Sequence, residues 1–202
     1  MTHEIEAGGQ TFSFVRLEPE DLAQALLLCD QCVGKNLYTR EELMQAIEDE
    51  NSTFQILKTE EGQIAGYVYY YLTDTEQIAR TARLKETKIS EVCKHGSEMP
   101  VGKIQSVGIR EEFRGRGLAG QLVRFALDRL GRMGASEAFI ICWNIKGQVP
   151  LGKVLKECSF THLTTAKMIW YDKKELYCPY CKGRCKCDAE IYYKRISINC
   201  DK

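Results

Sequence analysis

Apolar and polar positions follow two periods along the chain, and together they predict a domain that mixes strands with helices. Alternating or continuous apolar runs predict strands at residues 11–17, 54–57, 64–72, 103–109, 137–143, 159–163 and 166–171. Apolar residues spaced three and four apart predict helices that begin near Pro19, Thr39, Leu118 and Pro150. The expected order of elements is therefore β-α-α-β-β-β-α-β-α-β-β.

The first two helices carry local signals of their own. Pro19 and the acidic residues after it occupy favoured first-turn positions, and Thr39 with Glu42 has capping-box spacing. Cys29 and Cys32 lie three residues apart on the first helix, so they share one face. Free cysteine packs as a small apolar side chain, which favours core thiols here. A redox pair, or two ligands of a metal shared with the C-terminal cysteines, are the alternatives.

Residues 73–102 lack a clear period, and such a length is unusual for a simple connection inside a compact domain. The segment is either a partly helical insertion or functional. A helix over residues 77–94 is the expectation, with four apolar residues directed inward: Ile78, Ala82, Ile89 and Val92.

A glycine-rich segment, residues 107–120, joins the strand 103–109 to the helix that follows it. Glycines directly before a helix leave its first backbone N–H groups uncovered, and the helix dipole adds partial positive charge there. The segment therefore predicts an anion site that suits phosphate. Two plainer interpretations are a glycine-rich turn that caps an ordinary helix, and an exposed Arg-Gly-Arg-Gly segment with nonspecific affinity for nucleic acid.

The charge balance excludes some classes of protein. Lys and Arg number 28 and Asp and Glu also number 28, so the basic excess of a general nucleic-acid binder is absent and no nucleic-acid partner is expected. No apolar run reaches the roughly eighteen residues of a membrane span, so no membrane association is expected. Residues 1–6 lack the basic and apolar regions of a signal peptide. We therefore expect a cytoplasmic protein.

Cysteine is unusually frequent, with ten residues in the chain, and four of them lie close together: Cys178, Cys181, Cys185 and Cys187. A reducing compartment argues against a disulfide framework. Cys-Pro-x-Cys is typical of a zinc knuckle, and four thiolates can complete a tetrahedral shell with no open position for catalysis. We expect structural zinc; free or disulfide-linked thiols and an iron–sulfur cluster are the alternatives.

The composition changes after residue 171, which predicts two units: a main domain at residues 1–171 and a cysteine-rich, zinc-knuckle-like tail at residues 172–202. Residues 191–198 are expected to form a strand that docks on the main domain or on a partner.

Arg114-x-x-Gly117-x-Ala119 resembles the Gln/Arg-x-x-Gly-x-Gly/Ala signature of the GNAT superfamily of N-acetyltransferases, and the element order over residues 11–171 is similar to its topology. The resemblance implies an α/β (α+β) fold with a mixed, mostly antiparallel sheet flanked by helices and splayed between its fourth and fifth strands. It implies acetyl-coenzyme A (acetyl-CoA) as cosubstrate. The positions that it assigns to binding this molecule are Val107, Gly108, Ile109, Arg114, Gly115, Arg116, Gly117, Leu118, Ala119 and Asn144.

The acid and base of the implied reaction do not follow from the resemblance. Where many relatives carry a Glu early in the fourth strand, this chain has Lys103, which cannot act as a base while protonated. Where many carry a thiol-protonating Tyr, it has Leu155. The remaining catalytic candidates are Ser106 and Glu98, with Gln105 or a water chain as further substitutes.

The leading hypothesis is a cytoplasmic N-acetyltransferase that modifies a primary amine of a small molecule or peptide. A non-catalytic acyl-CoA-binding or regulatory module is the first alternative, and an interaction protein whose zinc tail docks a partner is the second. The residues leave the acceptor amine and the oligomeric state open, a dimer included.

Overall fold

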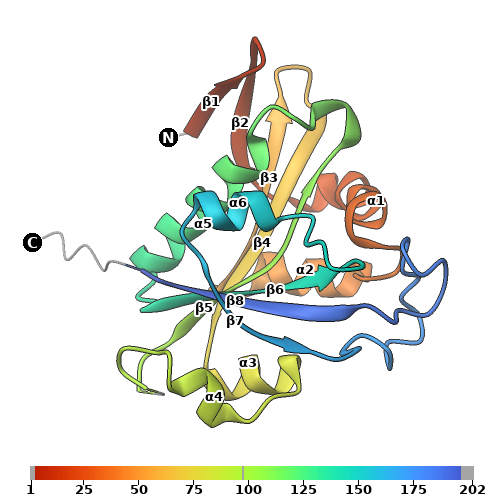
Figure 1. Cartoon of the computed structure of the whole chain (residues 1–202). Helices are drawn as coiled ribbons and strands as arrows, with labels where there is room; N and C mark the ends of the chain where they lie inside the picture. The colour runs from red at the N-terminus through yellow and green to blue at the C-terminus, as the bar shows by residue number, and fades with distance from the viewer. Residues whose placement is uncertain (1–2, 97, 197–202) are drawn as a thin grey trace, which may run out of the picture.

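A computed structural model describes residues 3–96 and 98–196 of the 202-residue chain (Figure 1). The strands are β1 (His3–Ala7), β2 (Gln10–Arg16), β3 (Ser52–Thr59), β4 (Ile64–Thr73), β5 (Val101–Ile109), β6 (Glu137–Asn144), β7 (Thr161–Ala166) and β8 (Asp188–Arg195). The helices are η1 (Pro19–Asp21), α1 (Leu22–Val33), α2 (Arg40–Glu48), α3 (Thr75–Ala82), α4 (Glu86–Ser90), η2 (Glu111–Phe113), α5 (Leu118–Arg132) and α6 (Gly152–Glu157).

All strands belong to one sheet in the order β1-β2-β3-β4-β5-β6-β8-β7. Every neighbouring pair is antiparallel except β5 and β6, which run parallel. The predicted mixed, mostly antiparallel sheet is therefore confirmed. Strand β1 is not predicted by the pattern because its side chains are mostly exposed and charged, so it carries little apolar signal.

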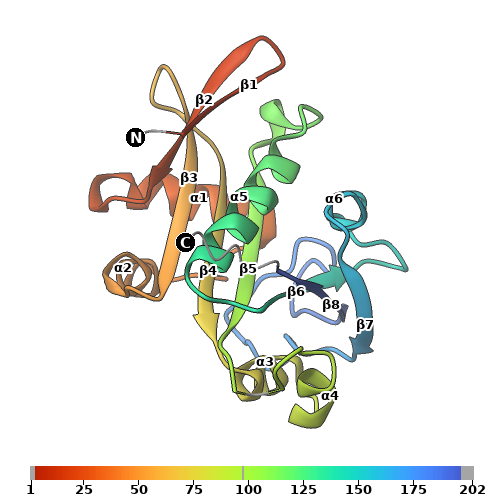
Figure 2. The same ribbon diagram turned by 90° about the vertical axis from the view of Figure 1, so that its left-hand side faces the viewer.

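Helices cover both faces of the sheet. Helices α5 and α6 pack on one face, where Leu122 and Leu155 join a core with strand residues such as Ile104. Helices α1 and α2 cover the opposite face of the N-terminal half (Figure 2). Helices α3 and α4 pack beside β6 and β8 in a third core. Among the described residues, no helix combines the length and apolar character that crossing a membrane would need.

The capping box of α2 is confirmed. The Glu42 backbone N–H donates to Thr39 Oγ1 at 3.1 Å, and the Thr39 N–H donates to the Glu42 carboxylate at 2.8 Å. These two bonds satisfy N–H groups that the first helical turn leaves free.

The insertion at residues 73–102 contains two short helices instead of the single predicted helix at 77–94. The chain turns at Arg83, which adopts a left-handed backbone with φ of +55° and caps α3. Ile78, Ala82 and Ile89 are buried as predicted, and Val92 is partly buried. The apolar pattern survives the break because both helices pack on the same core.

The predicted hairpin between residues 159–163 and 166–171 is wrong in its second strand. Residues 167–171 form no strand, and Ile169 and Trp170 pack into the third core instead of pairing. Strand β7 pairs with β8, which in turn pairs with β6 and so separates the two.

The predicted C-terminal strand is confirmed up to Arg195, while residues 197–202 lie outside the described part of the chain. The segment after residue 171 thus places a strand inside the main sheet. The division of the chain at residue 172 stays a prediction.

The position of β8 predicts how a core substitution in it behaves. Ile191 is fully buried between the sheet and α3, so Ile191→Ala should lower the free energy of unfolding by about 2–4 kcal/mol. Arg195→Ala, at the exposed end of the same strand, should change it by less than about 0.5 kcal/mol. Denaturant unfolding followed by circular dichroism measures both. A separate early transition confined to the C-terminal segment would contradict an integral β8.

Candidate active site

The parallel strands β5 and β6 pair over a short distance and then part. Their register runs from Gly102 opposite Ala138 to Ile104 opposite Ile140, after which β5 continues to Ile109 beside β4 and β6 continues to Asn144 beside β8. Figure 2 shows β5 running toward α5 while β6 and β8 turn away. This opening is the splay that the resemblance implies between the fourth and fifth strands of the predicted order.

A cavity of about 150 Å³ occupies the splay. Its walls come from both strands, from the end of α1 and from the segment that follows β7, and they include Gln105, Ser106, Val107, Cys142, Trp143 and Trp170. A neighbouring hollow of about 330 Å³ lies between α2, β4 and β5, lined by residues such as Tyr69, Tyr71 and Lys173. Gln105 borders both spaces, so they adjoin each other at the middle of β5.

A β-bulge marks the middle of β5. Tyr69 on β4 lies opposite Ser106 and Tyr70 lies opposite Ile104, so Gln105 is the additional residue. Ser106 Oγ is 2.7 Å from the hydroxyl of Tyr38, which precedes α2. Burial raises the pKa of the Tyr38 phenol well above its ordinary value, so this hydroxyl stays protonated. A serine backed by a neutral phenol therefore faces the cavity.

The residues beyond the bulge present backbone groups to the splay. The Arg110 N–H donates to Ala65 O on β4 at 2.9 Å. Alternation along an antiparallel pair then directs the polar groups of Ile109 and Val107 away from β4 and those of Gly108 toward it. A Cβ on Gly108 would lie 2.4 Å from the Tyr67 ring and 2.9 Å from Cys32 Cβ. Gly108 is thus required by close packing with the helix-covered face, as an isolated strand glycine suggests.

The glycine-rich loop places the N-terminus of α5 next to the carboxyl end of β5. Gly115 and Gly117 adopt left-handed backbones with φ of +78° and +77°, and no atom lies within 4 Å of a Cβ built on either. The glycines are therefore required by backbone conformation, and the space above them is open. Gly117 is the N-cap of α5 and makes no side-chain cap, so the first N–H groups of the helix lack that partner.

The two arginines of the loop have different roles. Arg116 donates to Gln10 Oε1 at 3.1 Å and to Glu112 O at 3.2 Å, so its guanidinium ties the loop to β2. Arg114 uses only its Nε, which donates to Ile109 O at 3.1 Å. Within the described residues its exposed guanidinium forms no ion pair and otherwise lies near the Cys32 thiol, whose pKa it lowers against the larger effect of burial. Arg114 is therefore the loop cation that is available to an anion.

Two other candidates lie away from this arrangement. Asn144, at the end of β6, donates to Glu190 at 2.6 Å and accepts from the Gly147 N–H at 2.7 Å, so both ends of its amide are occupied. Glu98 is exposed in the loop before β5 and lines neither hollow. Ser106, by contrast, lies in the cavity wall.

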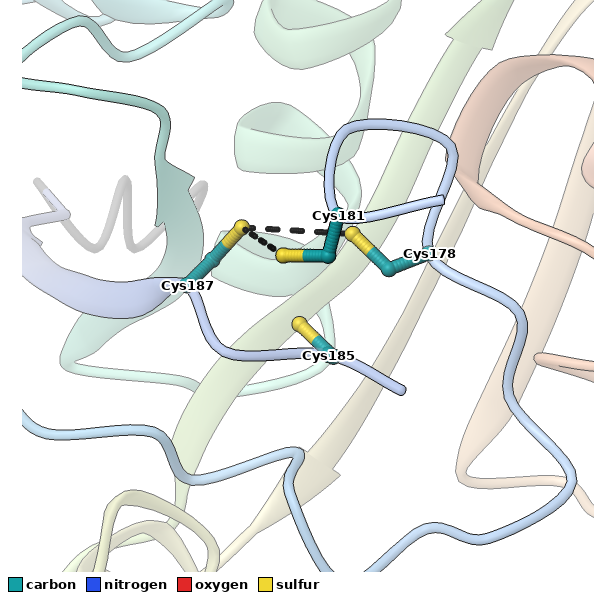
Figure 3. Close-up of side chains that lie close together, drawn as sticks. All are labelled: Cys178, Cys181, Cys185 and Cys187. Atoms are coloured by element: carbon teal, nitrogen blue, oxygen red, sulfur yellow. Dashed lines mark hydrogen bonds between the residues drawn. The ribbon is translucent and has the colours of Figure 1, made fainter. Parts of the chain in front are cut away.

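The four tail cysteines converge on one point (Figure 3). Their sulfurs all lie within 4.8 Å of one another, with Cys187 Sγ 3.6 Å from Cys181 Sγ and 3.9 Å from Cys178 Sγ. Four sulfurs about 2.3 Å from a zinc ion form a tetrahedron with edges of about 3.8 Å. The donor set therefore fits a zinc ion in both number and spacing.

Local backbone features hold this cysteine loop, residues 176–187, in shape. Gly183 adopts a φ of +155° and its carbonyl accepts from the Cys178 N–H at 2.8 Å, which reverses the chain. The Lys186 N–H donates to Cys181 Sγ at 3.3 Å, and this bond lowers the pKa of the Cys181 thiol against the effect of burial. Among the described residues, no other group of side chains has this ligand-like clustering, and Cys29 is buried in the α1 core.

The cysteine loop packs beside the cavity. Cys178, Cys185 and Leu176 form a small core with Trp143 and Trp170, and Trp143 meets the Tyr180 ring edge-on at 5.7 Å. All three aromatic residues line the cavity. The Tyr177 N–H donates to Lys35 O just after α1 at 3.0 Å. The loop is therefore a wall of the candidate active site as well as a possible metal site.

A family model described as the acetyltransferase (GNAT) family matches residues 20–148, which is more than half of the chain. The chain belongs to the acetyltransferase (GNAT) family. Members of this family are acetyl-CoA-dependent acetyltransferases, so this chain is an enzyme of that class. No curated protein sequence matches this GNAT chain.

Solved structures agree with the family at the level of fold. Naa20 of Chaetomium thermophilum, in complex with a bisubstrate analogue, is 17% identical with a TM-score of 0.67, over 92% of this chain and 87% of that one. Arabidopsis thaliana NAA60, in complex with acetyl-CoA, is 14% identical with a TM-score of 0.69, over 92% and 98%. The ribosomal-protein-S18-alanine N-acetyltransferase of Escherichia coli is 12% identical with a TM-score of 0.63, over 95% and 97%.

The structure adds residues to this GNAT site that the sequence pattern does not single out. Tyr38 carries no motif, and its contact with Ser106 joins positions 68 residues apart. Lys103 is only 3% exposed in the cavity wall, and burial, with a smaller effect of Lys173, lowers its pKa to about 7. A charged residue in the largely apolar strand 101–109 is the one sequence signal that points to it.

The loop geometry predicts a selective effect on ligand binding. Gly117→Ala places a Cβ at the open N-terminus of α5 and strains a left-handed residue, so the Kd for acetyl-CoA should rise about tenfold or more. Gly134→Ala, beyond the other end of α5, has a similar strain at φ of +95° and equally open space. Both variants should lose about 1–2 kcal/mol of stability, but calorimetry should find weaker binding only in Gly117→Ala.

Proposed function

We propose that the protein transfers the acetyl group of acetyl-CoA to a primary amine. The observation that carries this proposal is the opening of β5 from β6 beside the uncovered N-terminus of α5. The opening between β5 and β6 accepts a narrow chain, and the N-terminus of α5 offers N–H groups to a diphosphate. A fold alone does not define a function, but these two sites together suit one ligand class.

The residues proposed to hold acetyl-CoA divide between backbone and loop. The N–H groups of Val107 and Ile109 face the splay and suit the amide carbonyls of the pantetheine arm, while Gly108 lets the strand lie close to α1. The cavity of about 150 Å³ is below the usual range for whole ligands, so it suits the arm and not the nucleotide. Asn144 supports this wall through its bonds to Glu190 and Gly147.

The diphosphate is proposed to lie at residues 114–119. The first N–H groups of α5, at Leu118 and Ala119, supply donors, and Gly115 and Gly117 keep the approach open. Arg114 supplies the free positive charge. Arg116 supports diphosphate binding indirectly, because its guanidinium holds the loop to Gln10 and Glu112.

For the chemistry, acetyl-CoA supplies the reactive thioester and the chain supplies proton transfer and positioning. Ser106 is the proposed proton donor to the departing thiolate, with the buried Tyr38 phenol behind it. We prefer Ser106 over Glu98 because only Ser106 lines the cavity.

An assay on the full chain tests the proposal. Acetyl-CoA and a panel of amines are incubated with the protein, and coenzyme A and acetylated product are measured by chromatography and mass spectrometry. We expect coenzyme A release that depends on the amine, reduced about 10²-fold in Ser106→Ala. Tyr38→Phe should have a smaller effect, because it removes only the supporting hydroxyl. Tight binding of acetyl-CoA without turnover of any amine would instead favour the non-catalytic module.

We also propose that the cysteine loop binds one structural zinc ion. The spacing of the sulfurs and the N–H donor at Cys181 support zinc, whose all-cysteine sites are closed to substrate. The described cysteines are all free, which supports the reducing, cytoplasmic compartment that we propose for the protein. The ion would stabilise a cavity wall and would take no part in the chemistry.

Elemental analysis of purified protein should find close to one zinc per chain, absent from the double variant Cys181→Ser/Cys185→Ser. Cys93→Ser alters a buried thiol outside the cluster and should keep the metal. Because structural zinc contributes to folding, the double variant should also unfold at a lower temperature. Metal-free protein with an ordered cysteine loop would contradict this proposal, and bound iron with visible absorption would favour a cluster.

A further inference from the structure

Lys103 is a buried lysine whose charge has no partner. It lies in β5, opposite Phe139 of β6, and is 3% exposed. Its Nζ makes no hydrogen bond or ion pair with any described residue, and it lies over the Tyr71 ring at 5.7 Å from the centroid. Lysine is almost never buried this fully without a pairing group. The fold therefore keeps an amine where a charge is unfavourable.

The amine of Lys103 lies near both the cavity in the splay and the neighbouring hollow. Lys103 lines the cavity in the splay together with Gln105 and Ser106. The Tyr71 ring beneath its Nζ lines the neighbouring hollow, where Tyr71 Oη donates to Gln105 Oε1 at 3.3 Å. Lys103 thus lies where the space proposed for the thioester meets a second space open to an incoming amine.

The groups around Lys103 disfavour its protonated form. Besides Lys103, the titratable side chains that line the two spaces are Cys32 on α1, Tyr38, Glu42 and Asp49 at α2, Tyr69 and Tyr71 on β4, Cys142 on β6, Lys173 after β7 and Tyr180 of the cysteine loop. Burial raises the pKa values of Tyr69, Tyr71 and Cys142, so they stay neutral. Neither carboxylate pairs with Lys103, while Lys173 repels its charge. Burial first, and Lys173 second, lower the pKa of Lys103 to about 7.

We propose that Lys103 Nζ accepts the proton that the acceptor ammonium group loses before it attacks the acetyl carbon. This inference rests on the proposed acetyl transfer. The freed amine forms the C–N bond as the C–S bond breaks. Of the three protons of the ammonium group, one passes to Lys103 and on to water, and one stays on the amide. The third replaces the proton that the Ser106 hydroxyl gives to the departing sulfur, so Ser106 ends as it began.

The cost of this transfer also depends on the pKa of the acceptor. An α-amino group has a pKa of about 7.7–8.0 and a lysine side chain one of about 10.4. Transfer to Lys103 costs about 1 kcal/mol for the first and more than 4 kcal/mol for the second, so the two acceptors differ by a factor of about 10²–10³. A peptide with a free α-amine should therefore react faster than the same peptide with a blocked terminus and one internal lysine.

The pH profile of kcat/KM tests the role. Wild-type activity should fall below about pH 7, because Lys103 becomes protonated there. Lys103→Met keeps the length and burial of the side chain but removes the base, so kcat/KM should fall roughly 10²–10³-fold. The variant then needs an amine that is already neutral, so its acid limb should move to the pKa of the acceptor, about 7.7–8.0 for an α-amine. Lys103 also lines the cavity proposed for the pantetheine arm, so the Kd for acetyl-CoA is measured alongside, and the position of the acid limb is the readout of the base role.

The charge of Lys173 gives a sharper test, because it changes the pH profile through Lys103. Lys173 lowers the pKa of Lys103, so Lys173→Gln should raise that pKa, protonate more Lys103 at a given pH and move the acid limb to higher pH. The shift should shrink in high salt, since Lys173 is exposed. Lys174→Gln removes the adjacent exposed charge, which has no effect on Lys103, and should leave the limb in place.

Three results would overturn the base role: an acid limb that stays near pH 7 in Lys103→Met, a limb unmoved by Lys173→Gln, or stoichiometric acetylation of Lys103 in wild-type protein by mass spectrometry, which would make it an acceptor. In each case turnover of amines would leave the proposed function standing. Absence of turnover with every amine at every pH would overturn both.

Discussion

The structure depends on one constraint in its sheet: β5 must stay paired with β4 along its length while it leaves β6 after Ile104. The parting uncovers backbone N–H groups in the middle of a sheet, where they would normally be satisfied by a neighbouring strand. It also directs β5 to the N-terminus of α5, so uncovered strand and helix donors lie at one opening. Lys103 belongs to the last paired stretch, which is why it is buried and yet borders the cavity.

The other side of the opening is built by the C-terminal part of the chain. Strand β8 takes the place beside β6, and the cysteine loop that precedes it reaches back to Lys35 after α1. Trp143, Trp170 and Tyr180 pack between that loop and the cavity. The segment after residue 171, whose composition differs from the rest of the chain, is thus part of the site wall. Its four thiols stabilise that wall only if a common ligand binds them.

Much of the fold could be predicted because its signals are local. Thr39 and Glu42 define the start of α2, and the stripe through Leu122 defines the buried face of α5. The pairing of β7 could not be predicted. Ala166, Ile169 and Trp170 are apolar because they pack into the third core, and no local pattern separates this from a strand. The break at Arg83 also lacks a sequence signal, since a left-handed arginine is not expected from its residue type.

The candidate site divides in the same way. The phosphate loop is a contiguous pattern with a physical reason for each glycine, so it is visible in the sequence. The protonation state of Lys103 cannot be predicted from the neighbouring sequence. Its neutral form depends on burial by residues from β4, β6 and the segment after β7. A lysine that a sequence alone excludes as a base becomes a plausible one only when its surroundings are known. Tyr38 and Ser106 likewise meet only in the folded chain.

The order of the strands has a consequence for how the chain acquires its structure during synthesis. Strand β7 emerges before β8 but has no pairing partner in the sheet until β8 arrives, because β8 lies between it and β6. Until then, the edge of β6 is open, and exposed edges invite pairing with other chains. The cysteine loop lies directly between β7 and β8, and closing a long loop costs entropy. An ion that gathers four thiols early would shorten that loop and bring the missing strand to the edge that it protects.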